Sequence, residues 1–141
     1  GSEKLHFACH GMFNPIDPYR SGLKLKDAWL TVRDITTRMN LSGTELVVMS
    51  SCLSGFSGVS KGEELTGLLT AFIASRAKAV VGSLWSVDDK STARFMIEFY
   101  KNLENGKPKV EALRDAQLYI RKQIQWSHPY YWAPFFITGV D

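Results

Sequence analysis

The sequence predicts an α/β domain built on a mostly parallel sheet. Short apolar segments with strand character alternate with amphipathic helical segments, which is typical of domains in which helices cover a parallel sheet. The final strand-like segment follows two consecutive helical segments. Because two helices return the chain to the end of the sheet where it started, we expect this last strand to run antiparallel. A chain of 141 residues suits one domain with a substantial core.

The first half of the chain contains two expected core strands and one helix. Residues 3–9 and 45–50 are short and largely apolar, as expected of buried strands. Thr31 and Asp34 have the spacing of a capping box, with Asp in place of Glu. They predict a helix that continues to about Met39.

The segment between the first strand and this helix has turn chemistry. Residues 11–21 include Asn-Pro and Asp-Pro pairs, and we expect them to form a loop. Leu23 and Leu25 then alternate with Lys24 and Lys26, which indicates a small exposed hairpin.

The second half of the chain should contain three helices and two strands. The expected order, after a loop over 53–61, is a helix over 62–76, a strand over 77–84, helices over 89–104 and 108–125, and a strand over 132–138. Asn105-Gly106 is a typical helix end, and Pro108 is a typical helix start.

Composition excludes several classes of protein. The 45% hydrophobic and 22% charged residues are ordinary for a soluble globular protein, and no apolar run approaches the length of a membrane span. Two cysteines are too few for a disulfide scaffold, so we expect a reducing compartment, the cytoplasm. The net charge of +3 is scattered, which argues against nucleic-acid binding. Gly1 and Ser2 resemble the remnant of a removed tag, and we assign residues 3–141 to the domain.

A thiol and an imidazole each follow an expected strand. His10 comes just after the strand over 3–9, and Cys52 comes just after the strand over 45–50. If these strands are parallel neighbours, both side chains emerge at the sheet edge where α/β domains bind ligands. A nearby histidine favours the reactive thiolate and can protonate a leaving amine. The N–H groups of Gly11 and Cys52 would supply an oxyanion hole, so the pattern suits acyl transfer.

The alternative is that both residues are inert and buried. Cys9 should point away from His10 and serve as a small core residue, because neighbouring strand residues face opposite sides. For the same reason we expect no zinc site formed by Cys9, His10 and Cys52, and we expect no other metal or cofactor. His6 and His128 are interpreted as structural residues.

Five sequence blocks resemble the CHAT domain family. They occur in the family's order and cover nearly all of residues 4–140: HFACHG, LVVMSSCLSG, GEELTGLLTAFIASRAKAVVGSLWSVDD, FYKNLENGKPKVEALRDAQ and HPYYWAPFFITG. CHAT domains are caspase-like modules related to separases and are often fused to tetratricopeptide repeats. The resemblance implies a three-layer caspase-hemoglobinase fold.

The resemblance also implies a cysteine endopeptidase that uses no cofactor. The family's catalytic residues match His10 and Cys52. This chain departs from the family pattern at two positions beside the cysteine. Leu53 stands where the family frequently has an acidic residue, and Ser51 stands where the family has Ala. We expect these departures to change loop contacts more than chemistry, and we place Ser51 among the substrate-binding residues. A non-catalytic CHAT module that acts as a protein-interaction platform is the alternative function.

Two acidic residues follow the strand over 77–84. In separases, a stretch similar to the one containing Trp85, Asp88 and Asp89 helps to form the pocket for a basic P1 side chain. The resemblance therefore implies that these three residues bind substrate, with a carboxylate paired to Arg or Lys. The alternatives are that Asp88 or Asp89 caps the next helix and that Trp85 only packs.

The resemblance further implies that this chain matches the C-terminal part of a CHAT domain. Caspase-like sheets usually have two strands before the strand that carries the histidine. Without them, residues 5–9 form a sheet edge with unpaired backbone groups. We expect this edge to pair with a second copy, giving a homodimer, or with an upstream segment of a protein that also carries tetratricopeptide repeats. The remaining partner would be a protein or peptide substrate.

Overall fold

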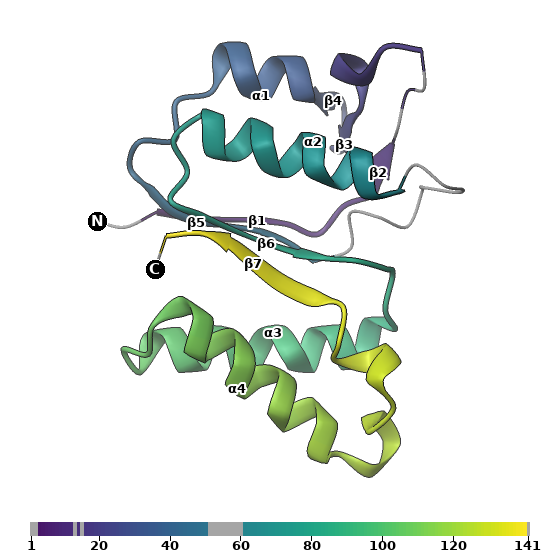
Figure 1. The fold of residues 1–141 in the computed structure, drawn as a ribbon, viewed down its shortest axis with the longest axis vertical. Coiled ribbons are helices and arrows are strands. Elements are labelled where there is room, and N and C mark those ends of the chain that lie inside the picture. The colour runs from purple at the N-terminus through teal and green to yellow at the C-terminus, as the bar shows by residue number, and fades with distance from the viewer. Residues whose placement is uncertain (1–2, 13, 15, 51–60, 141) are drawn as a thin grey trace.

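The computed structural model describes residues 3–12, 14, 16–50 and 61–140. Its elements form three layers, with a sheet between two pairs of helices (Figure 1). Helices α1 (Val32–Arg38) and α2 (Lys61–Ala74) cover one face of this sheet. Helices α3 (Asp89–Glu104) and α4 (Lys109–Lys122) cover the other face. The three-layer arrangement is the one that the sequence predicts.

The main sheet has four strands in the order β1-β5-β6-β7. Strand β1 (Glu3–Phe7) pairs in parallel with β5 (Thr44–Met49), and β5 pairs in parallel with β6 (Ala79–Ser83). Strand β7 (Phe135–Gly139) runs antiparallel to β6. The mostly parallel sheet and its antiparallel last strand are therefore confirmed.

Apolar side chains fill the space on both faces of the sheet. Alternation along β5 sends Val47 and Met49 to the α1–α2 side, and Leu46 and Val48 to the α3–α4 side. All four are at most 2% exposed. Both sides of β5 are thus buried, as expected for a central strand of a parallel sheet.

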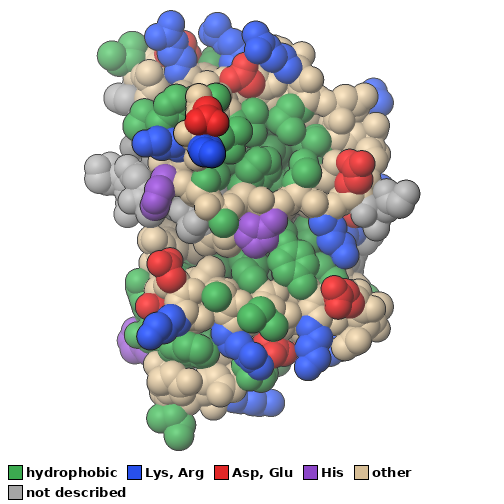
Figure 2. Space-filling view, turned by 180° about the vertical axis from the view of Figure 1, so that it is seen from behind, with side chains coloured by type: hydrophobic (Ala, Val, Ile, Leu, Met, Phe, Trp, Pro, Cys, Tyr) green, Lys and Arg blue, Asp and Glu red, His purple; other side chains and the backbone are tan. Residues whose placement is uncertain are grey.

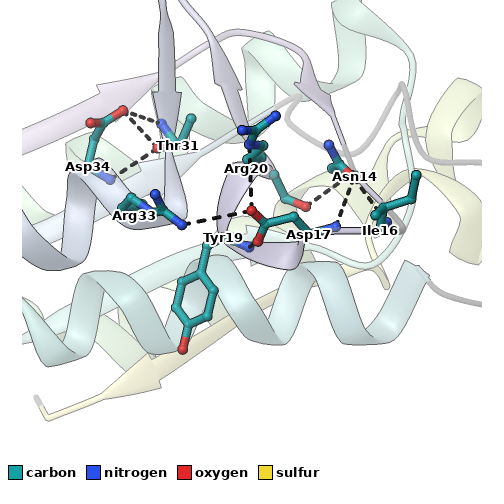
Figure 3. A network of polar contacts seen from close by, with 9 residues as sticks. Asn14, Ile16, Asp17, Tyr19, Arg20, Thr31, Arg33 and Asp34 are labelled. Carbon is teal, nitrogen blue, oxygen red and sulfur yellow. Dashed lines mark hydrogen bonds and ion pairs between the residues drawn. The ribbon is translucent and has the colours of Figure 1, made fainter.

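The helix starts follow the predicted capping chemistry. The Thr31 hydroxyl accepts a hydrogen bond from the Asp34 N–H at 3.1 Å, and the Asp34 carboxylate accepts one from the Thr31 N–H at 3.2 Å (Figure 3). The predicted capping box at the start of α1 is therefore confirmed. Asp88 caps α3, and Gly106 follows the end of α3 with a φ of +83°.

The segment between β1 and α1 differs from the sequence-based expectation. Instead of a plain loop and an exposed hairpin, it forms a second, three-stranded sheet from β2 (Gly11–Met12), β3 (Gly22–Lys24) and β4 (Trp29–Thr31). Leu23 of this sheet is fully buried against the core on the α1–α2 side. The Leu-Lys alternation is a strand over Gly22–Lys24 only, and the predicted exposure is wrong for Leu23 but right for Leu25, which lies beyond β3 and is 37% exposed.

Polar contacts order the connection from β2 to β3. Asp17 accepts a hydrogen bond from the Tyr19 N–H at the start of a short 3-10 helix (Pro18–Arg20). Its carboxylate also lies 3.5 Å from Arg20 and 3.8 Å from Arg33, while the Asn14 side chain accepts two backbone N–H groups (Figure 3). The loop expected over 11–21 is therefore partly regular, because its side chains replace missing backbone partners.

Other boundaries shift by a few residues. The last strand begins at Phe135, three residues later than expected, because Pro129–Tyr131 form a 3-10 helix. Helix α4 ends at Lys122, and Ile124–Trp126 form another short 3-10 helix. Within the described part of the chain, none of the helices combines the length and the apolar character that a membrane crossing needs.

Candidate functional site: the carboxyl edge of strands β1 and β5

The two strands that precede His10 and Cys52 are parallel neighbours that end at the same level. Phe7, the last residue of β1, pairs with Met49, the last residue of β5. The Ser50 N–H extends this pairing by donating to the Phe7 carbonyl oxygen at 3.2 Å. This edge is where an open α/β sheet presents residues to a ligand.

His10 lies three residues beyond β1 and is exposed. Its carbonyl oxygen accepts a hydrogen bond from the Lys24 N–H at 2.8 Å, which ties this position to β3. The side chain lines a hollow of about 520 Å³ together with residues 6–9 and 24–26. Two of these lining residues, Lys24 and Lys26, bring positive charge close to the imidazole.

Cys52 and Ser51 lie outside the described residues. Cys52 follows Met49 by three positions, as His10 follows Phe7 by three positions. The predicted dyad of His10 and Cys52, and the substrate-binding role of Ser51, stay predictions.

Gly11 begins β2 directly after His10. It faces Leu23 across the β2–β3 ladder, whereas the preceding pair, His10 and Lys24, is joined by a backbone hydrogen bond. Because hydrogen-bonded and non-hydrogen-bonded pairs alternate in an antiparallel ladder, the Gly11 N–H points away from β3. Gly11 itself is buried, and its predicted role in an oxyanion hole stays a prediction.

The residues after β6 divide into a helix cap and an aromatic pocket. The Asp88 carboxylate accepts a hydrogen bond from the Ser91 N–H at 3.0 Å, so Asp88 is the residue that caps α3, and Asp89 is exposed in the first turn. Trp85 donates from its indole N–H to the Tyr130 carbonyl at 3.0 Å and lines a hollow of about 570 Å³ with Tyr130. Trp85 therefore both packs and borders an open space.

Two predicted structural residues take the expected places. Cys9 is half-buried and packs against the core on the α1–α2 side. His128 caps the 3-10 helix over 129–131 by accepting the Tyr130 N–H at 3.1 Å.

His6 makes contacts that the sequence reasoning missed. One imidazole nitrogen lies 2.7 Å from the Tyr100 hydroxyl, and the other lies 2.9 Å from the Ser50 hydroxyl. The signal for this was present in the pattern of β1. Leu5 and Phe7 face the α1–α2 side, so alternation turns His6 toward α3, which carries Tyr100.

Burial shifts the ionisation of both rings in this contact. It lowers the pKa of His6 below its ordinary value of 6.5, since the charged imidazolium loses hydration. It raises the pKa of Tyr100 to about 12. At neutral pH the histidine is therefore mainly uncharged, and the tyrosine keeps its proton.

Three layers around a mostly parallel sheet with an antiparallel last strand define the class of the protein as a caspase-like α/β domain. The family model of the CHAT domain matches residues 1–140. The chain belongs to the CHAT domain family.

Two curated relatives are named tetratricopeptide repeat protein 28. The protein from Mus musculus is 32% identical over 117 residues, which are 83% of this chain and 5% of the relative. The protein from Homo sapiens is 34% identical over 97 residues, which are 69% of this chain and 4% of the relative. This chain thus corresponds to a small part of the length of both relatives.

Proposed function

We propose that this CHAT domain is a cysteine endopeptidase that uses Cys52 as nucleophile and His10 as general base and acid. The observation that carries the proposal is the pairing of β1 and β5. The parallel strands β1 and β5 end in register at Phe7 and Met49. The chain reaches His10 three residues after Phe7 and Cys52 three residues after Met49.

The reaction would proceed in two steps. The Cys52 thiolate attacks the carbonyl carbon of the scissile peptide bond, and the N–H groups of Gly11 and Cys52 stabilise the resulting oxyanion. The carbon–nitrogen bond then breaks as His10 gives its proton to the leaving amine. Water then attacks the thioester carbonyl carbon as His10 takes one of its protons. The carbon–sulfur bond breaks, the acid leaves, and the Cys52 thiolate and protonated His10 are restored for the next cycle.

The pocket residues support a preference for a basic P1 side chain. Both carboxylates are exposed, but Asp88 already accepts a hydrogen bond as the cap of α3. We therefore assign Asp89 to the substrate cation and Trp85 to the apolar part of the same side chain. Ser51 would contact the substrate backbone beside the nucleophile. In the longer protein, the substrate would be a protein brought to the domain by tetratricopeptide repeats of the same chain.

The dyad is tested by the pH dependence of Cys52 alkylation with iodoacetamide. The Cys9→Ala background removes the second thiol, and peptide mapping locates the label. We expect Cys52 to react faster below pH 7 than a model thiol, and the advantage to disappear in His10→Ala. His128→Ala removes an exposed imidazole that caps the 3-10 helix over 129–131 and that the proposal gives no part in proton transfer, so it serves as the matched control and should keep the fast reaction.

The alternative function, a non-catalytic interaction platform, predicts a different result. Cys52 would then follow the titration of an ordinary thiol near pH 8.5 in all three proteins. Peptide-library cleavage by this chain and by the longer natural protein, each beside its Cys52→Ala variant, separates the two functions further. Cleavage that persists in Cys52→Ala would contradict the proposed nucleophile.

A further inference from the structure

Three side chains from different elements meet beside the carboxyl edge. His6 comes from β1, Tyr100 comes from α3, and Ser50 directly follows β5. The imidazole lies between the two hydroxyls, at 2.7 Å from Tyr100 and 2.9 Å from Ser50. The rings of His6 and Tyr100 are also in contact, with centroids 5.7 Å apart. The bridge therefore links two strands and one helix through a single residue.

A neutral imidazole can satisfy both contacts of the bridge. In one tautomer the Tyr100 hydroxyl donates to Nδ1 and Nε2–H donates to the Ser50 hydroxyl oxygen; in the other, Nδ1–H donates to Tyr100 and the Ser50 hydroxyl donates to Nε2. Because each hydroxyl can both donate and accept, the imidazole keeps one partner on each side in either tautomer.

Ser50 is held to β1 twice. Its N–H donates to the Phe7 carbonyl oxygen at 3.2 Å, and its hydroxyl contacts His6. Ser50 lies two residues before Cys52 in the sequence, and His6 lies four residues before His10. Contacts that fix Ser50 against β1 therefore fix the relative position of the two strand ends.

Figure 1 looks at the sheet from its β7 edge, so Figure 2, which is turned by 180°, faces the β1 edge. On this side, apolar side chains are exposed above and below the level of the sheet (Figure 2). Strand β1 has fewer packing neighbours here than β5, because it pairs with one strand of the described sheet only. A side-chain bridge from β1 to both β5 and α3 compensates for this missing support.

We propose that His6 is a positioning residue of the peptidase site: by holding Ser50 and being held by Tyr100, it sets the end of β5 relative to the end of β1, from which the chain continues to His10. This inference rests on the proposed function. His6 itself takes no part in proton transfer to the substrate.

The test measures Cys52 alkylation and peptide cleavage in variants of the bridge, again in the Cys9→Ala background. His6→Leu removes both contacts. His6→Gln keeps a side-chain amide that can donate to Ser50, and Ser50→Ala removes the same contact from the other side. Tyr119→Phe is the matched control for Tyr100→Phe, because its hydroxyl also makes one side-chain hydrogen bond in the α3–α4 layer, accepting from Arg94 at 2.8 Å.

We expect His6→Leu and Ser50→Ala each to lower kcat by about tenfold with little change in KM, since misplacement of reacting groups lowers the rate. The alkylation profile of Cys52 should move toward that of an ordinary thiol. His6→Gln should recover most of the rate, Tyr100→Phe should lose two- to threefold, and Tyr119→Phe should lose nothing. Combining His6→Leu with Ser50→Ala should cost no more than His6→Leu alone, because His6→Leu already removes the contact that Ser50→Ala removes.

The outcomes separate this inference from the proposed function. A wild-type Cys52 with ordinary thiol reactivity contradicts the peptidase proposal itself. A fast wild-type Cys52 that stays equally fast in folded His6→Leu and Ser50→Ala contradicts the positioning role alone. Thermal unfolding and circular dichroism establish folding, and if His6→Leu does not fold, the comparison of Ser50→Ala with His6→Gln decides.

Discussion

The two helical layers of this domain differ in how they are built. The α3–α4 layer consists of two helices of 16 and 14 residues, joined by a short turn at Gly106. The α1–α2 layer combines a helix of seven residues with the small β2–β3–β4 sheet and with α2, which follows the segment carrying Cys52. The first of these layers is formed by long helices alone, whereas the elements that follow His10 and Cys52 along the chain, β2 and α2, belong to the second.

The difference is visible in the aromatic residues of the two cores. Phe95 of α3 stacks on Phe135 of β7 with ring centroids 3.9 Å apart. Phe72 of α2 is equally buried, but its stacking partner is the half-buried Phe7 of the edge strand, at 5.7 Å. The two layers thus pack against opposite edge strands of the described sheet: the α3–α4 layer against the buried Phe135 of β7, and the α1–α2 layer against the half-buried Phe7 of β1.

The largest expected effect tests this difference between the aromatic cores of the two layers. Phe95→Ala should lower the free energy of unfolding by about 4–5 kcal/mol, near the upper end for a buried phenylalanine. Phe72→Ala should cost about 3 kcal/mol, because the half-exposed surroundings of Phe7 can close over part of the cavity. Urea denaturation of both variants measures the difference. Equal losses, or a larger loss for Phe72→Ala, would break the comparison.

The helix caps should give the next largest effect. Asp88→Ala removes the carboxylate that accepts the Ser91 N–H and should cost about 1 kcal/mol. Asp89→Ala, the matched neighbour, should change stability by a few tenths of a kcal/mol only, because no cap depends on it. In cleavage assays the order should reverse, with Asp89→Ala losing the preference for basic peptides. A loss of that preference in Asp88→Ala alone would assign the pocket to the other carboxylate.

The capping box of α1 should make the stability of the α1–α2 layer sensitive to acid. Two hydrogen bonds hold the pKa of Asp34 below its ordinary value of 3.8. The bond from the Thr31 hydroxyl has the larger effect, and the bond from the Thr31 N–H has the next largest. A carboxyl group with a lowered folded pKa stabilises the fold at higher pH. Its contribution is lost as the pH falls from about 4 through that folded pKa. In Asp34→Asn, the decrease in stability below pH 4 should be shallower, as measured by urea denaturation at several pH values.

The smallest expected effect compares the ends of α2 and α3. Arg76 has a φ of +77° and Gly106 has a φ of +83°, so both occupy the left-handed region that favours glycine. Arg76→Gly should therefore stabilise the domain, and Gly106→Ala should destabilise it, each by up to about 1 kcal/mol. Differential scanning calorimetry resolves the two signs. A destabilised Arg76→Gly would show that the arginine side chain contributes more than the strain that it imposes.

Much of the fold could be predicted because local signals and tertiary packing agree. The helix over 89–104 matches α3 at both ends, since Asp88 and Asn105-Gly106 are strong boundary signals. The β2–β3–β4 sheet was missed in part because a two-residue strand at Gly11 leaves no periodic pattern. Its pairing with β3 depends on the distant contact of Leu23 with the core.

The candidate site shows the same division. The positions of His10 and Gly11 at the carboxyl edge follow from the order of strands and helices, which the sequence contains. The bridge of His6 with Ser50 and Tyr100 joins residues 44 and 94 positions away from His6. Such contacts are fixed by the packing of α3 beneath the sheet, and no pattern within one segment encodes them.

The register of β1 against β5 makes the geometry of the proposed site discontinuous. A displacement of β1 by one residue would turn Leu5 and Phe7 toward α3 and expel His6 from its bridge. A displacement by two residues keeps the apolar side chains on their face, but it carries His10 along by about 7 Å. The His10 imidazole can therefore move along the sheet edge only in steps of whole residues. A sequence change in β1 either keeps the spacing between the ends of β1 and β5 or loses it.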